Sequence, residues 1–135
     1  MVQMSYVFLR SGKVENAVLM AEDAIKKNPE YVPGLVLLGE LYNSRKDPEK
    51  ATKAFKKAIS LDPSQNEAYL FLGAIYATEK NYDDAIEVLE SLLKIEPDSS
   101  MALYYLGLIN IEIEAYDKAG GYLKRAVDVK PNFDS

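Results

Sequence analysis

The sequence predicts an all-α protein built from about four stacked pairs of antiparallel helices. Two observations predict this fold class: several residue types recur every 34 residues, and the apolar residues inside each period have helical spacing. The recurring residues are Pro29, Pro63, Pro97 and Pro131, then Ala17, Ala51, Ala85 and Ala119, and then Gly39, Gly73 and Gly107 with Ser5 one step earlier. Three residue types that share one period over the whole chain indicate a repeat architecture.

The second period shows how each repeat forms two helices. Residues 35–42 place leucines and a tyrosine on one helical face, and residues 51–59 place alanines and larger apolar residues on another. Asp47 can cap the open N–H groups of the second helix, and Pro48 is preset for the first helical position. Pro63 then ends that helix. No long stretch alternates with the period of a strand.

Small residues recur where the two helices of a pair are expected to cross. Only small side chains let two helix backbones approach closely, so the sequence predicts three crossings. These are Gly39 with Ala51, Gly73 with Ala85, and Gly107 with Ala119. A single pair cannot bury its own apolar faces, whereas stacked pairs can.

This pattern resembles the tetratricopeptide repeat family. The matching residues are Leu35, Leu38, Gly39, Tyr42, Ala51, Phe55, Ala58 and Pro63; Tyr69, Leu72, Gly73, Tyr76, Ala85, Leu89 and Pro97; Leu103, Leu106, Gly107, Ala119, Leu123, Ala126 and Pro131; and a partial copy, Met1, Met4, Ser5, Phe8, Ala17, Ala21, Ala24 and Pro29. The resemblance implies a right-handed α-solenoid, with residues 1–135 forming a single domain. The approximate repeats are 1–31, 32–65, 66–99 and 100–133.

The chain departs from the family pattern at a few positions. Asn110 stands where the family favours tyrosine, and Leu92 replaces a small alanine. Ile113 stands where the earlier repeats carry polar residues, which suggests that something covers the last repeat. Gly120 and Gly121 weaken the last helix by about 1 kcal/mol each, so the final repeat is expected to fray first.

In this family the first helix of each pair lines a concave groove, where partners lie as peptides or helices. The resemblance therefore implies a set of partner-binding residues. They are Tyr6 and Leu9; Val36, Glu40 and Asn43; Leu70, Ala74 and Ala77; and Met101, Tyr104, Leu108 and Ile111.

The stretch 101–116 is too apolar for a helix that lies on the surface of a small domain. Core packing is expected for Leu103, Leu106 and Ile109. The remaining apolar residues, Tyr104, Leu108 and Ile111, face the groove, and exposed apolar surface of this kind marks a binding site. The alternative is that a C-terminal segment absent from this chain folds over them.

Composition argues against several classes of function. The chain has no histidine and no cysteine, which removes the commonest general base, thiolate nucleophiles and the commonest metal ligands. No glycine-rich phosphate loop is present, so neither an enzyme nor a cofactor is expected. A net charge of −5 argues against nucleic-acid binding, and no stretch is long and apolar enough to insert into a membrane.

Two functions remain. The first is a non-enzymatic scaffold that binds a protein partner, as an apolar peptide or an amphipathic helix, in the groove. The second is a self-assembly module of a larger scaffold or coat, formed by homo-oligomerisation. Chaperone C-terminal tails are not expected as partners, because the positions that would hold their carboxylate carry no lysine or arginine. Those positions are Val2, Tyr6, Glu40, Glu67 and Phe71.

Charge is uneven along the chain. Residues 45–57 hold six basic and two acidic residues, and residues 79–98 hold seven acidic and two basic residues. A solvated outer face explains both runs, although opposite signs could also pair between molecules. The chain is expected to be a soluble segment of a longer repeat protein, in the cytoplasm or the periplasm.

Overall fold

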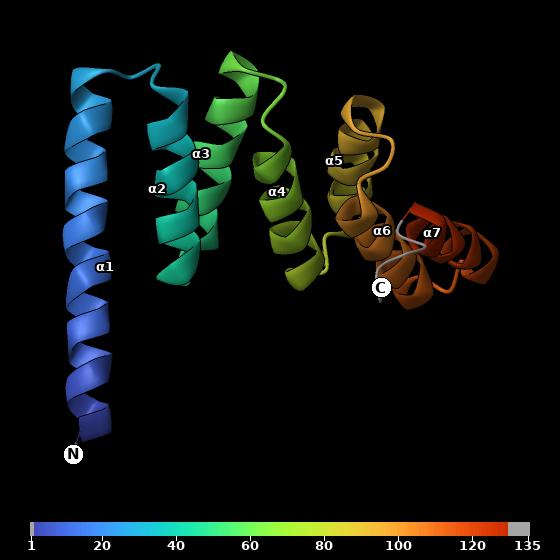
Figure 1. Cartoon of the computed structure of the whole chain (residues 1–135), viewed down its shortest axis with the longest axis horizontal. Helices are drawn as coiled ribbons and strands as arrows, with labels where there is room; N and C mark the ends of the chain where they lie inside the picture. The colour runs from blue at the N-terminus through green and yellow to red at the C-terminus, as the bar shows by residue number, and fades with distance from the viewer. Residues whose placement is uncertain (1, 130–135) are drawn as a thin grey trace. The chain divides into compact units, whose positions relative to one another are not determined.

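A computed structural model of the protein contains seven α-helices and no strand in residues 2–129, the part of the chain whose backbone it describes; side chains are described for residues 12–129. The all-α fold class predicted from the sequence is therefore confirmed. The helices are α1 (Val2–Lys27), α2 (Val32–Ser44), α3 (Pro48–Leu61), α4 (Asn66–Thr78), α5 (Tyr82–Ile95), α6 (Ser100–Glu112) and α7 (Tyr116–Val129) (Figure 1).

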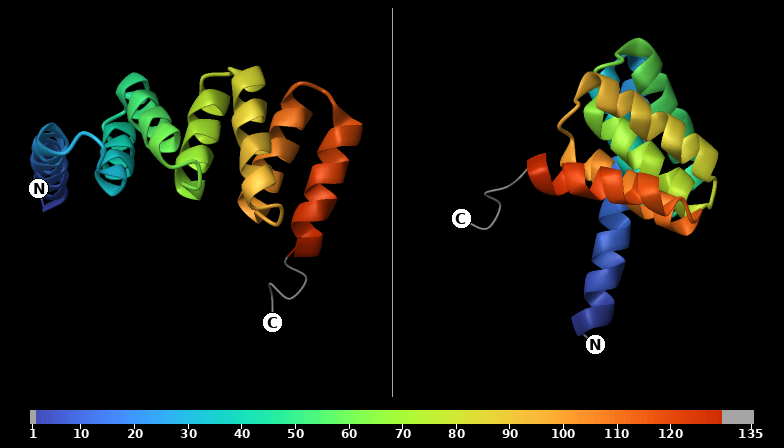
Figure 2. Two further views of the ribbon diagram at one scale, coloured as in Figure 1. Left: turned by 90° about the horizontal axis from the view of Figure 1, so that it is seen from above. Right: turned by 90° about the vertical axis from the view of Figure 1, so that its right-hand side faces the viewer.

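The helices group into two compact units, unit 1 (Met1–Pro63) and unit 2 (Ser64–Ser135). In unit 1, α2 packs against α3, and α1 packs against α2. In unit 2, α4 pairs with α5 and α6 pairs with α7, as the two hairpins in the left view of Figure 2 show. Because α6 also contacts both α4 and α5, it joins the two hairpins of unit 2.

Each hairpin turns at the same place in the repeat. Lys46, Lys80 and Glu114 all have a φ of 62°, in the left-handed region that side chains rarely adopt. The next residue then donates its backbone N–H to a carbonyl five residues earlier, which closes the first helix of the pair. These hydrogen bonds are Asp47 to Tyr42 at 2.9 Å, Asn81 to Tyr76 at 2.8 Å, and Ala115 to Asn110 at 2.7 Å.

The first repeat departs from the expected pair of helices, because α1 runs without a turn from Val2 to Lys27 (Figure 1). The counterpart of Lys46 in this repeat is Gly12, which is helical. Lys13 and Val14 follow it in place of the Asp47-Pro48 start. Lysine has no oxygen that could cap a helix, so this stretch lacks the signal that begins a second helix.

The recurring glycines accommodate large side chains of the partner helix. A Cβ added at Gly73 would lie 2.6 Å from Leu89, which is fully buried. The sequence predicts Ala85 at this crossing; it is buried too, but the atoms nearest to Gly73 belong to the residue one turn later. Helical side chains lean toward the helix N-terminus, so Leu89 reaches back over the crossing. The equivalent contacts are Gly39 with Phe55 at 2.6 Å and Gly107 with Leu123 at 2.5 Å.

Candidate functional site

Helix α6 buries one side and exposes the other, although both sides are apolar. Leu103 and Leu106 are fully buried and Ile109 is 3% exposed, which confirms that these three residues belong to the core. The exposed side carries four large apolar residues. Met101 and Tyr104 are each 47% exposed, Leu108 is 39% exposed and Ile111 is 40% exposed.

These four residues follow the spacing i, i+3, i+7 and i+10, which forms a stripe along one side of a helix. At 1.5 Å of rise per residue the stripe is about 15 Å long. Helix α4 contacts α6, and its predicted groove residues are half-buried. We call this surface the α4–α6 face; it comprises Leu70, Ala74, Ala77, Met101, Tyr104, Leu108 and Ile111.

The α4–α6 face combines a bulky apolar stripe with acidic ends. Ala74 and Ala77 occupy the repeat positions of Leu108 and Ile111, so the larger apolar side chains of the face come from α6. Glu67 at the start of α4 and Glu112 at the end of α6 are both exposed. The face is therefore apolar along α6 and acidic at Glu67 and Glu112.

In unit 1 the predicted groove residues present less surface. Val36 is only 9% exposed and Glu40 is half-buried, whereas Asn43 is exposed. The side chains of Tyr6 and Leu9 lie outside the described residues. Leu37, which is not among the predicted site residues, is 48% exposed. The apolar part of the predicted site that the structure brings together therefore lies in unit 2.

Neither a metal centre nor a membrane span emerges from the described residues. Among them, no group of three or more acidic residues could hold a metal ion. None of the helices in that part of the chain combines the length and apolarity that crossing a membrane requires.

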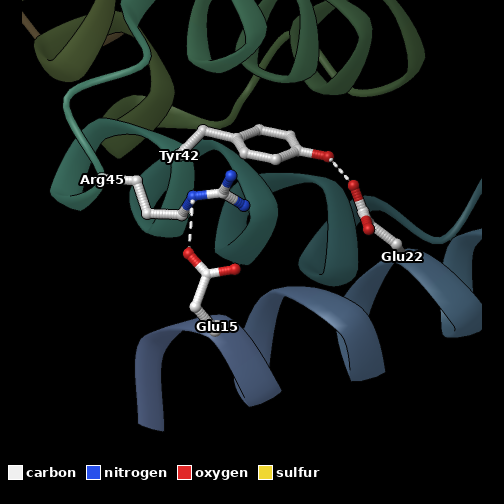
Figure 3. A network of polar contacts seen from close by, with 4 residues as sticks. All are labelled: Glu15, Glu22, Tyr42 and Arg45. Carbon is white, nitrogen blue, oxygen red and sulfur yellow. Dashed lines mark hydrogen bonds and ion pairs between the residues drawn. The ribbon is translucent and has the colours of Figure 1, made fainter. Parts of the chain in front are cut away.

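Unit 1 contains a polar network around a buried tyrosine, shown in Figure 3. Tyr42 of α2 donates its hydroxyl to a carboxylate oxygen of Glu22 in α1. Arg45 Nε lies 3.2 Å from Glu15 Oε1, so the end of α2 is tied to α1 by a second contact. The ammonium of Lys50 lies 5.7 Å from the centre of the Tyr42 ring, within range of a cation–π interaction. Burial, followed by the hydrogen bond to Glu22, raises the pKa of Tyr42 to about 12.

Unit 2 contains an open pocket of about 540 Å³ at the side of α5, α6 and α7. We call it the α5–α7 pocket. Tyr122 of α7 donates its hydroxyl to Glu90 of α5 across it, at 3.3 Å. Burial, with the negative charge of Glu90, raises the pKa of Tyr122. The lining of the pocket includes Asp83, Glu90, Asn110, Ile113, Lys118 and Tyr122.

The sequence by itself does not predict a site at the α5–α7 pocket. Its signal in the sequence is the pair of departures at Asn110 and Ile113, of which Ile113 suggests only that something covers the last repeat. Asn110 is buried and donates its side-chain amide to the Leu106 carbonyl at 2.7 Å. Only the structure shows that these two positions line one pocket with Asp83 and Glu90.

Comparisons with solved structures support the repeat architecture. A structure titled "Crystal structure of MamA" matches with 27% identity and a TM-score of 0.85, over 92% of this chain and 72% of the other. A second, "Crystal structure of MamA protein", matches with 27% identity and a TM-score of 0.84, over 92% and 68%. "MamA 41-end from Desulfovibrio magneticus RS-1" shares the fold at 19% identity, with a TM-score of 0.82 over 98% and 75%. No curated protein matches the sequence significantly.

A family model agrees with the resemblance seen in the sequence. The model described as the tetratricopeptide repeat protein 21 C-terminal ARM domain matches residues 3–133. This match covers the repeats, both units and the two surfaces described above. The chain is therefore a tetratricopeptide-repeat protein that belongs to the family of the tetratricopeptide repeat protein 21 C-terminal ARM domain.

Proposed function

We propose that the protein is a non-enzymatic scaffold whose α4–α6 face binds the apolar side of an amphipathic helix. The observation that carries the proposal is the stripe of Met101, Tyr104, Leu108 and Ile111. Four large apolar side chains in one line, each 39–47% exposed, expose more apolar surface than scattered single residues do. Membership of a family of helical-repeat scaffolds supports a protein partner.

The shape of the stripe favours a helix over an extended peptide. Its spacing of three and four residues matches the ridges through which helices pack on one another. An extended strand would instead need free backbone hydrogen-bonding groups, and the backbone groups of α6 are used within the helix. The partner helix would then lay its own apolar stripe along α6.

The charges of unit 2 support a partner with basic residues beside its apolar stripe. Glu67 and Glu112 are exposed at the ends of the α4–α6 face, and the whole chain carries a net charge of −5. Opposite charges at the rim of an interface speed association and orient the partner more than they add affinity. Burial of Leu108 and Tyr104 would supply most of the binding free energy.

The test uses a labelled leucine–lysine peptide with helical apolar spacing, and a scrambled peptide of the same composition as its control. Binding is measured by fluorescence anisotropy with the full chain. Leu108→Glu should weaken binding by at least about tenfold, because it places a charge in the centre of the apolar stripe. Leu19→Glu is the matched control, since Leu19 is 63% exposed on α1 and lies outside the face.

Each outcome has a distinct meaning for the proposal. Equal affinity of wild type and Leu108→Glu, with helicity unchanged by circular dichroism, would refute the assignment of the face. Equal binding of the ordered and the scrambled peptides would show that the face does not select a helix. A loss of binding in Leu19→Glu as well would mean that the weakening does not come from the α4–α6 face.

A further inference from the structure

We propose that the α5–α7 pocket binds a tyrosine side chain of a protein partner, with a basic side chain of the same partner beside it. This inference concerns a surface other than the α4–α6 face and does not depend on the function proposed for that face. It rests on a comparison between two places in the same chain that the repeat makes equivalent.

The tyrosine network of unit 1 occupies the position in the repeat that is equivalent to the α5–α7 pocket of unit 2. The Tyr42 ring is 8% exposed, its hydroxyl donates to Glu22, and Lys50 lies over its face. Arg45 forms the neighbouring ion pair with Glu15 (Figure 3). The network thus joins the phenol of α2 and the guanidinium that directly follows α2 to two carboxylates from α1.

The α5–α7 pocket lies two repeats, or 68 residues, further along the chain. Each residue of the network has its repeat counterpart, 68 positions later, in the lining of that pocket. The correspondences are Glu15 with Asp83, Glu22 with Glu90, Tyr42 with Asn110, Arg45 with Ile113, and Lys50 with Lys118. The two carboxylates and the lysine are kept. The two groups that they hold in unit 1, the phenol and the guanidinium, are both replaced.

The replacements remove the donor that Tyr42 gives in unit 1 and the charge that Arg45 gives, so within the described part of the chain Asp83 has no ion pair and Glu90 keeps only a hydrogen bond from α7. Asn110 turns its amide back to the Leu106 carbonyl on its own helix and does not donate to Glu90. Ile113 cannot pair with Asp83, and among the residues that the structure describes no ion pair to Asp83 is formed. Tyr122 reaches Glu90 from α7, but its hydrogen bond is long, at 3.3 Å, and about 540 Å³ of open pocket remains beside it.

The side chains that line the pocket indicate which kind of ligand would fit it. A ring that enters from solvent would meet the apolar side chain of Ile113 and could receive the ammonium of Lys118, as the Tyr42 ring receives that of Lys50. A phenol can donate a hydrogen bond to Glu90, which phenylalanine cannot. A basic neighbour supplies Asp83 with the charge that Arg45 supplies to Glu15. Tyrosine next to arginine or lysine therefore fits this pocket.

The test is an NMR titration of the ¹⁵N-labelled full chain with N-acetyl-tyrosyl-arginine amide. Phenylalanyl-arginine and tyrosyl-glutamine amides serve as controls. The Asn110 side-chain amide and the Gly121 backbone amide report on the pocket. The tyrosyl-arginine probe should bind about tenfold more tightly than the phenylalanyl probe, which is the effect of one hydrogen bond to a charged acceptor. Equal affinities of the two probes would overturn the proposal.

Three variants sharpen the test. Asn110→Tyr restores the missing ring from within, so it should raise the melting temperature and abolish probe binding. Glu90→Ala removes an exposed acceptor and should erase the preference for tyrosine over phenylalanine. Ile113→Arg should erase the preference for arginine over glutamine. Because Ile113 is 44% exposed, the new side chain does not have to fit into the core. Unchanged probe binding in all three variants would show that the pocket is not the site.

The Leu108→Glu variant separates this proposal from the function proposed for the α4–α6 face. Leu108 does not line the α5–α7 pocket, so the tyrosyl-arginine probe should bind this variant as it binds wild type. Loss of probe binding in Leu108→Glu would place the probe on the α4–α6 face and refute a separate site. Loss of helical-peptide binding alone would leave the tyrosine site standing.

Discussion

Single glycines determine how closely the two helices of each pair approach. At Gly39, Gly73 and Gly107 the added Cβ would lie 2.5–2.6 Å from a large side chain of the partner helix. Contacts below 3.0 Å require something to move, and at Gly73 and Gly107 the nearest atoms include the branch carbon of a leucine as well as its ends. Glycine is needed at these positions for packing, since none of the three has a positive φ.

We expect Gly73→Ala to destabilise the protein by about 1–3 kcal/mol, because its methyl group would overlap Leu89 Cγ and Cδ2. Urea unfolding followed by circular dichroism measures the change. Gly120→Ala is the matched control: a Cβ there meets nothing within 4 Å, so helix propensity alone should stabilise it by up to about 1 kcal/mol. A Gly73→Ala variant as stable as wild type would show that α4 and α5 are farther apart than described.

We expect Tyr42 to make stability fall with pH in the alkaline range. Its pKa is raised from 10.0 to about 12 by burial and by the hydrogen bond to Glu22. The folded state therefore keeps a proton that the unfolded state releases, and the resulting stabilisation is complete below pH 10.0 and is lost as pH rises through about 12.

Urea unfolding at a series of pH values across this range measures the effect. Tyr42→Phe should be less stable than wild type near neutral pH by about 1 kcal/mol, the value of one hydrogen bond. It should also show a shallower loss of stability between pH 10.0 and about 12. The same alkaline slope in both proteins would contradict a raised pKa at Tyr42.

At the scale of the helix, the repeat predicted the hairpins well but not the first one. Proline and alanine recur in all four periods and glycine in the last three, and those three periods form the expected turn at Lys46, Lys80 and Glu114. In the first period the same place reads Gly12-Lys13-Val14, and the chain continues as a helix. A shared period therefore indicates where a turn can form, whereas the local capping residues decide whether it does.

We expect Gly12→Ala to stabilise the protein by up to about 1 kcal/mol, because Gly12 is helical and a Cβ there meets nothing within 4 Å. In a turn like those at Lys46 and Lys80, alanine would instead be forced to a positive φ and would destabilise the protein. The sign of the change in unfolding free energy thus tests whether α1 is continuous. A less stable Gly12→Ala variant would show that the first repeat forms a hairpin.

The candidate sites show the same division between what the sequence predicts and what it does not. The α6 stripe could be predicted, because helical spacing separates Leu103 and Leu106 from Leu108 and the family resemblance implies which side faces the groove. The α5–α7 pocket could not be predicted, because it depends on a side chain that is missing and on which neighbours remain around the gap. Asn110 alone reads as a tolerated change; beside Glu90 it does not offer the donor that Tyr42 offers to Glu22.

At the scale of the whole molecule, unit 2 holds both proposed binding surfaces, and α6 contributes to each. Leu108 belongs to the α4–α6 face, whereas Asn110 and the adjoining Ile113 line the α5–α7 pocket. Residues on different sides of one helix can contact different partners, or two parts of one partner. If one protein contacts both surfaces, linking a helical segment to a tyrosine motif would raise its overall affinity above that of either part.

We expect the wild-type chain to be a monomer in solution, because the α4–α6 face is suited to a partner other than a second copy. Two such faces would bring the acidic Glu67 and Glu112 of both copies near one apolar contact, and each chain already carries a net charge of −5. Light scattering over a range of concentrations should therefore give the mass of one chain for wild type and for Leu108→Glu alike. A wild-type oligomer that becomes monomeric in Leu108→Glu would instead make a second copy the occupant of the face, and the protein a self-assembling scaffold.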